Sequence, residues 1–93
     1  MNTEDEKSKE IEFTDELDLH HFASRDTGFL VEYFIREAQE RGVDRVRIIH
    51  GKGRSAKKRE VYALLDRNQR VQSYGDDGHN WGSTVVVISP KTD

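Results

Sequence analysis

Cysteine is absent from this chain, so neither a disulfide framework nor a thiolate metal site can form. Proline occurs once, at Pro90, where it ends the last apolar run, and apolar residues make up only 33% of the 93 residues. No apolar run approaches the roughly 18–20 residues that a membrane-spanning helix needs. The first ten residues are acidic and polar, unlike a secretory signal. We therefore expect one soluble cytoplasmic domain that makes no membrane contact.

The net charge of −3 hides an uneven distribution. Residues 1–16 carry seven acidic and two basic residues, whereas residues 45–70 carry nine basic and two acidic ones. Local charge matters more to an anionic partner than the total, because surface fields are screened within about 8–10 Å. The basic region is either a surface for a polyanion or a solvated helix face.

Residues 1–14 have almost no apolar content beyond Ile11 and Phe13, too little to offset the entropy of ordering. We expect a flexible acidic arm over residues 1–14, a folded domain over residues 15–90 and a short tail over residues 91–93. Apolar periodicity in the domain predicts strands at 16–20, 43–49, 70–74 and 83–88 and helices at 27–41 and 55–68. Asp26 or Thr27 is the expected N-cap of the first helix, and Gly42 closes it. Residues 75–82 are dense in turn formers and predict a loop.

The order β-α-β-α-β-β predicts an α/β fold, a two-layer sandwich with a four-stranded mixed sheet. Right-handed crossovers place both helices on one face of the sheet. The last strand is a continuous apolar run, which favours a central position between strands two and three, antiparallel to strand two. Its first residues, with the loop at 75–82, then meet the carboxyl ends of strands one and two, the edge at which open α/β sheets bind ligands.

Candidate catalytic residues lie at that edge. Asp18 and His20 are two residues apart on a strand, and a carboxylate beside an imidazole can orient a base, hold a water or bind a divalent metal. Such a pair is also common as a plain surface hydrogen bond. His50 ends the second strand and completes the candidate catalytic set, although a histidine in this position is often structural.

The turn Gly51-Lys52-Gly53 follows His50 and precedes a helix, an arrangement that presents backbone N–H groups to a phosphate. Glycines permit positive φ and close backbone approach, and Lys52 offers a point charge. The P-loop pattern is absent, which argues against nucleotide hydrolysis by that route. Trp81 either stacks on an unpaired base or covers the sheet end. The candidate nucleic-acid-binding residues are Arg47, Gly51, Lys52, Gly53, Arg54, Lys57, Lys58, Arg59, His79 and Trp81.

The sequence allows two kinds of metal site. Asp18, His20, His50 and His79 could supply four zinc ligands, but nothing in their spacing requires zinc. A Mg²⁺ or Mn²⁺ ion recruited with a phosphate needs only one or two carboxylates, and Asp18 is the expected ligand. We expect no organic cofactor.

Four segments, taken in order, resemble the Smr (small MutS-related) domain: Leu17-Asp18-Leu19-His20, residues 45–53, residues 71–74 and residues 82–86. The resemblance covers about residues 16–88 and is to the stand-alone kind. It implies a fold like the C-terminal domain of translation initiation factor three, and binding and nicking of DNA, with RNA cleavage or ribosome-linked roles in some members. It also implies that Asp18 and His20 serve cleavage and that residues 50–53 contact phosphate. His21 stands where the family usually has glycine, and Trp81 is bulky for the family's glycine-rich lead into the last strand.

The predicted function is a monomeric nucleic-acid-binding domain with metal-assisted endonuclease activity on DNA or RNA. Asp18 would hold water or metal, His20 would act as general acid or base, and Lys52 with the turn amides would bind phosphate. Sequence specificity should be weak, because phosphate contacts carry no base information. The alternatives are a module that binds nucleic acid or a ribosome without cutting, and a plain protein-interaction domain.

Overall fold

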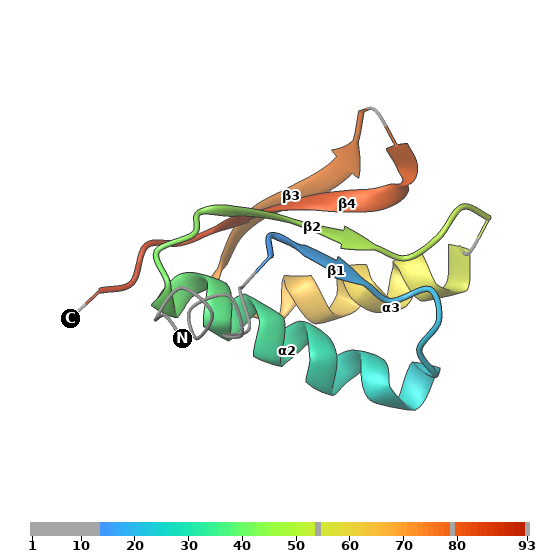
Figure 1. Ribbon diagram of the computed structural model, residues 1–93, viewed down its shortest axis with the longest axis horizontal. Coiled ribbons are helices and arrows are strands. Elements are labelled where there is room, and N and C mark those ends of the chain that lie inside the picture. Colours follow the sequence, from blue (N-terminus) through green and yellow to red (C-terminus); the bar gives the residue numbers. More distant parts are fainter. Residues whose placement is uncertain (1–13, 54, 79, 93) are drawn as a thin grey trace, which may run out of the picture.

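The structure is a computed structural model that describes residues 14–53, 55–78 and 80–92, without the side chains of Asn80 and Trp81. Within these residues no helix is both long and apolar enough to cross a membrane. The elements, in chain order, are β1 Glu16–Asp18, α2 Ser24–Glu40, β2 Arg45–Ile49, α3 Ser55–Asp66, β3 Val71–Asp77 and β4 Asn80–Ile88 (Figure 1).

The four strands form one sheet in the order β1-β2-β4-β3. β1 pairs with β2 in parallel, and β4 pairs antiparallel with both β2 and β3. Both helices lie on one face of this sheet (Figure 1). The predicted fold class is therefore confirmed, including the central position of the last strand.

The core fills the space between the sheet and the helices. Val46 and Ile48 of β2 and Val86 and Ile88 of β4 point towards the helices, because side chains alternate along a strand. From α2, the side chains that meet them recur with helical spacing. These fully or almost fully buried α2 residues are Val31, Phe34, Ile35 and Ala38, and α3 adds Val61 and Leu65.

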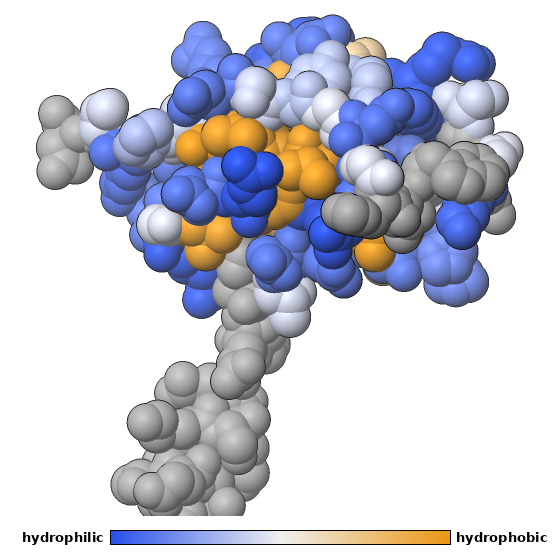
Figure 2. Space-filling view, turned by 90° about the horizontal axis from the view of Figure 1, so that it is seen from above, coloured by the Kyte–Doolittle hydropathy of each residue, from blue (hydrophilic) through white to orange (hydrophobic). Residues whose placement is uncertain are grey.

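The opposite face of the sheet is left open. Ile49, Val85 and Val87 are only half-buried there and make up apolar surface in the middle of the face, which Figure 2 views from above with hydrophilic residues around it. Arg47 lies on the same face, between the carboxylates of Glu16 and Asp77. Any side chain on the open face is therefore separated from the helix side by the sheet itself.

The start of α2 differs from the prediction. The helix begins at Ser24, a turn earlier than Thr27, and the residue before it, Ala23, makes no side-chain cap hydrogen bond. Asp26 thus lies inside the first turn, where a carboxylate interacts favourably with the helix dipole. The other end is as predicted: Gly42 has φ of 74° after the last helical residue.

The predicted loop at residues 75–82 is wrong. β3 continues to Asp77 and β4 begins at Asn80, with Gly75 opposite Val85 and Asp76 opposite Thr84. Glycine and aspartate have low strand propensity, but pairing with the adjacent strand overrides a local preference of this kind. The two strands form a long hairpin that bends away from the helices (Figure 1).

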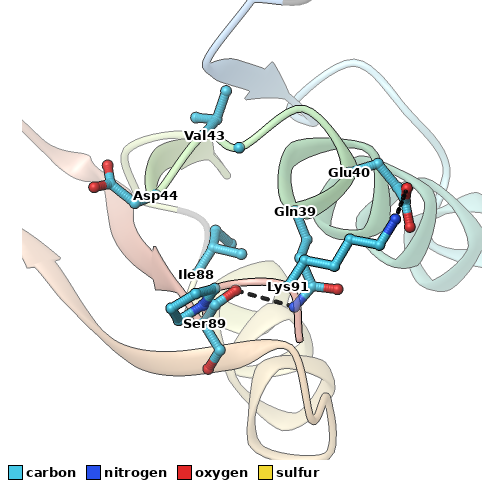
Figure 3. A pocket seen from close by; sticks show the side chains of 9 residues that line it. Gln39, Glu40, Val43, Asp44, Ile88, Ser89 and Lys91 are labelled. Carbon is cyan, nitrogen blue, oxygen red and sulfur yellow. Dashed lines mark hydrogen bonds and ion pairs between the residues drawn. The ribbon is translucent and has the colours of Figure 1, made fainter. Parts of the chain in front are cut away.

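A hollow of about 430 Å³ lies at the sheet end opposite His20 and His50 (Figure 3). Gln39 donates to the carbonyl of Ser89 at 3.0 Å, and Lys91 pairs with Glu40 at 2.7 Å. These contacts attach the segment after β4 to the end of α2. The residues that line the hollow are Gln39, Glu40, Gly42, Val43, Asp44, Ile88, Ser89, Pro90 and Lys91.

Candidate functional site

Asp18 and His20 form a hydrogen-bonded pair where β1 ends. The Asp18 carboxylate accepts both the backbone N–H of His20, at 3.1 Å, and a bond from its ring Nδ1. Acceptance of the N–H two residues on is an Asx turn, which ends the strand two residues earlier than predicted. The Leu19 N–H still donates to the Ile49 carbonyl at 2.8 Å, so the pair stays beside β2. The side chains of Asp18 and His20 are 50% and 36% exposed, open to a ligand.

The pair keeps the carboxylate ionised. Partial burial acts to raise the pKa of Asp18, but the side-chain and backbone hydrogen bonds from His20, together with the charges of His20 and His21, outweigh it. The net result is a pKa below the ordinary value of 3.8. Asp18 is therefore a hydrogen-bond acceptor at neutral pH.

Lys57 holds the connection that carries His20. Its side chain is 7% exposed, and its ammonium donates to the carbonyls of Phe22, at 2.6 Å, and Leu19, at 3.3 Å. The prediction that Lys57 contacts nucleic acid is therefore wrong, because its charge is inside the domain and bonded to backbone. The signal was present: Lys57, Val61 and Leu65 recur every four residues, on the buried side of α3.

The second part of the site is the turn after β2. Gly51 and Gly53 have φ of 100° and 74°, conformations that favour glycine, as predicted. The N–H groups of His50 and Gly51 both donate to the carbonyl of Gly82, at 3.0 and 2.9 Å. These two amides are thus already used, which corrects the expectation that the turn amides as a group bind phosphate.

Gly82 makes this contact because it has no side chain. A Cβ at that position would lie 2.9 Å from both the backbone nitrogen and the Cγ of Lys52. Such a separation is too short for real atoms, so the turn and β4 can approach only through a glycine. The sequence places Gly82 in a motif but does not reveal that the turn packs against it, because this contact joins residues 30 positions apart.

His50 lies on the helix side of the sheet and is 1% exposed. Its Nε2 is 3.0 Å from the Thr84 hydroxyl, and its Nδ1 has no hydrogen-bond partner among the described residues. Burial is the main cause that lowers the pKa of His50; the Lys58 charge adds to it, while the Gly51 backbone and Asp76 act against it. The ring of His50 therefore cannot touch a substrate in this conformation, and the assignment of His50 to the catalytic set is wrong.

The basic surface is smaller than the sequence indicates. Arg47 pairs with Glu16 at 2.6 Å and Asp77 at 2.8 Å on the open face. The hydrogen bond that Arg47 donates to Glu16 is the main cause that raises the pKa of Arg47; Asp77 adds to it and desolvation opposes it. Lys58 pairs with Asp76 at 2.8 Å, and Arg70 pairs with Glu32 at 3.4 Å. Lys52 and Arg59 are exposed near the start of α3, whereas Arg54, His79 and the Trp81 side chain lie outside the described residues.

The described residues contain no group of three histidine or acidic side chains that could hold a metal. Asp18 and His20 face solvent at the end of β1, whereas His50 is directed to the helix side. A zinc site built on these three does not fit this geometry. A single carboxylate, Asp18, fits an ion such as Mg²⁺ or Mn²⁺ that keeps several waters and is shared with a phosphate.

Fold and site together define a two-layer α/β domain whose sheet edge carries an exposed Asp–His pair beside a glycine–lysine turn. The family model described as the Smr domain matches residues 17–89, and the chain belongs to this family. The family predicted from the motifs is thus confirmed.

Curated relatives are much longer proteins. The chain is 32% identical over 80 residues to Endonuclease MutS2 of Thermus thermophilus and 39% identical over 76 residues to that of Halalkalibacterium halodurans. It is 36% identical over 87 residues to the putative endonuclease MutS2 of Bacillus subtilis. These alignments cover 81%, 78% and 91% of this chain but only 10%, 10% and 11% of the relatives. The chain therefore spans about a tenth of their length.

Two solved structures share the fold. The crystal structure of the Smr domain of Thermus thermophilus MutS2 has a TM-score of 0.77 and 30% identity, covering 83% of this chain and all of that one. YdaL, a stand-alone small MutS-related protein from Escherichia coli, has a TM-score of 0.71 and 26% identity, covering 89% of this chain and 70% of that one. The arrangement of strands and helices is thus shared by a MutS2 domain and a stand-alone protein.

Proposed function

We propose that this domain binds nucleic acid at the sheet edge and hydrolyses phosphodiester bonds in it, nicking DNA or cutting RNA with little sequence preference. The observation that carries the proposal is the exposed Asp18–His20 pair beside the turn Gly51-Lys52-Gly53. Support comes from relatives named as endonucleases, to which this chain corresponds over one domain.

The Asp18–His20 bond determines which ring nitrogen can act. A carboxylate only accepts hydrogen bonds, so the shared proton is on Nδ1 and Nε2 is the basic atom. Nε2 would take a proton from water, and the resulting hydroxide would attack phosphorus. The bond from phosphorus to the leaving sugar oxygen would break, that oxygen would take a proton from solvent water, and the imidazolium would release its own proton to solvent. Asp18 would orient the imidazole, and general-base catalysis by a positioned histidine contributes about 10²- to 10⁴-fold.

Phosphate binding would use what the turn and α3 leave exposed. Lys52 is exposed in the turn after β2, the strand that pairs with β1, and α3 begins at Ser55, so the first N–H groups of this helix have no acceptor within it. Arg59 adds charge one turn on. A divalent ion on Asp18, when bound, would neutralise charge on the phosphate.

The test compares nicking of supercoiled plasmid and cleavage of labelled RNA, in Mg²⁺ and in Mn²⁺, by the full chain and by Asp18→Asn and His20→Ala. Both variants should lose about 100-fold or more in cleavage rate and keep their affinity within a few fold. Asp44→Asn is the matched control, because Asp44 is exposed at the opposite end of the sheet. Unchanged cleavage in both site variants would refute the assignment.

Affinity is measured separately as a function of salt. Binding to phosphates should weaken by orders of magnitude between about 50 and 200 mM salt, and Lys52→Ala should reduce that salt dependence by about one phosphate contact. Binding by a wild-type chain that never cleaves would leave the alternative, a nucleic-acid or ribosome-binding module. Affinity that is absent, or flat with salt, would remove both functions.

A further inference from the structure

A second surface with ligand-binding character lies on α2, outside the residues used above. Phe29 and Tyr33 are 71% and 47% exposed, and their rings are nearly parallel, with centroids 6.2 Å apart and planes at 16°. They are four residues apart and so lie on one side of the helix. Single exposed apolar residues are common and need no explanation, but two aligned rings offer a stacking platform.

Arginines flank these two rings. Arg25 is exposed in the first turn of α2, and the Arg36 guanidinium lies 5.6 Å from the centre of the Tyr33 ring. Residues 25, 29, 33 and 36 recur at helical spacing, and we call them the α2 stripe. Three of the four acidic residues of the helix are matched by bases outside it: Glu32 by Arg70, Glu37 by Arg41 and Glu40 by Lys91. Asp26 is the fourth, so the two arginines leave this surface positive by one.

The α2 stripe begins at Arg25, five residues after His20 of the Asp18–His20 pair. The ring of His21 contacts that of His20, with centroids 3.8 Å apart, and Phe22 follows with 46% of its surface exposed. α2 starts two residues after Phe22. Aromatic and basic side chains thus follow one another in the sequence from the proposed cleavage site to Arg36, in the fourth turn of the helix.

We propose that the α2 stripe binds single-stranded nucleic acid next to the site of cleavage. Unpaired bases would stack on Phe29 and Tyr33, and phosphates would pair with Arg25 and Arg36. Stacking tolerates any sequence, because every base has a π face, whereas the bases of a duplex are not accessible to it. The position of the cut rests on the function proposed above. Aromatic residues with arginine also occur in protein interfaces, which the test must distinguish.

The test is fluorescence anisotropy on the full chain with two probes, a labelled oligothymidylate and a labelled duplex, each about 20 nucleotides long. The double variant Phe29→Ala/Tyr33→Ala should weaken single-strand binding about tenfold or more and duplex binding by less than about twofold. Phe29→Leu keeps apolar bulk but removes the ring, so it should also weaken only single-strand binding. Both side chains are exposed, and circular dichroism checks that the variants are folded.

Arg36→Ala is compared with Arg67→Ala, an exposed cation at the far end of α3. Only Arg36→Ala should affect the oligothymidylate. Unchanged single-strand affinity in the double variant, or equal losses on both probes, overturns the proposal for the α2 stripe. The proposed function still stands in that case if the wild type binds duplex and nicks it. A wild type that binds neither probe refutes the proposed function itself. Altered sedimentation of the double variant without altered single-strand binding identifies a protein contact and also overturns the proposal.

Discussion

Two connections leave the same edge of the sheet, and each is held by one residue of a distant element. The β1–α2 connection carries His20 and is held by the buried ammonium of Lys57 from α3. The β2–α3 connection carries Lys52 and is held by Gly82 of β4, through a carbonyl and the absence of a side chain. The ammonium of Lys57 thus positions the connection that carries His20, and close packing against Gly82 positions the turn that carries Lys52.

Because different residues hold the two parts of the site, a substitution that disturbs one part should leave the other intact. The Lys57 ammonium donates to the carbonyls of Leu19 and Phe22, while Gly82 contacts residues 50–52. A change at the first should disturb the Asp18–His20 pair, and a change at the second should disturb the turn that we propose binds phosphate.

Lys57→Met should have the largest effect. It removes the charged donor from the buried carbonyl of Leu19 and the partly buried carbonyl of Phe22, at a cost of about 3 kcal/mol in the free energy of unfolding, measured in urea. Lys58→Met is the matched control on the next residue; it removes a surface ion pair with Asp76 and should cost at most about 1 kcal/mol. In cleavage assays Lys57→Met should reduce the rate more than the affinity. Equal stabilities of the two lysine variants would contradict the role given to Lys57.

Gly82→Ala should come next, at about 2 kcal/mol, because the new methyl group must displace Lys52 or its backbone. Gly75→Ala is the control: this glycine is also in the hairpin, but a Cβ there meets nothing within 4 Å. Denaturation measures both costs. Nucleic-acid affinity should fall only for Gly82→Ala, and the cleavage rate of bound substrate should be retained. An affinity loss of the same size in Gly75→Ala would show that the turn is not the affected part.

The local features of the fold followed from the sequence. Alternation and helical spacing predicted all six elements, and the apolar run at residues 85–88 predicted the central strand. Gly42 at the end of α2 and the positive φ values of Gly51 and Gly53 were also predicted, because each depends on its own backbone. The start of α2 and the length of the hairpin were not, since both depend on what packs beside them.

For the site, the predictions from the sequence did not assign which side chains are exposed. His20 and His50 are both histidines at strand ends, yet one is 36% exposed and the other is buried. Alternation could have separated them, since residue 50 shares the parity of the buried Val46 and Ile48. Lys57 is a harder case. Its spacing with Val61 and Leu65 puts it on the buried side of α3, but a lysine is almost always solvated, and the carbonyls that accept its hydrogen bonds belong to the distant β1–α2 connection.

His50 gives the smallest and most specific effect. Burial lowers its pKa from 6.5 in the folded chain, so below about pH 6.5 the unfolded chain binds a proton that the folded chain does not. The contribution of neutral His50 to the free energy of unfolding is fully present above that pH and declines as the pH falls towards the pKa of His50 in the folded chain. His50→Gln retains a partner for Thr84 and removes the titration, so its free energy of unfolding should drop less than that of the wild type between about pH 7.5 and pH 5.5. If His50→Gln and the wild type lose equal stability over this interval, His50 is not held neutral by burial, and the contrast between the two histidines no longer stands.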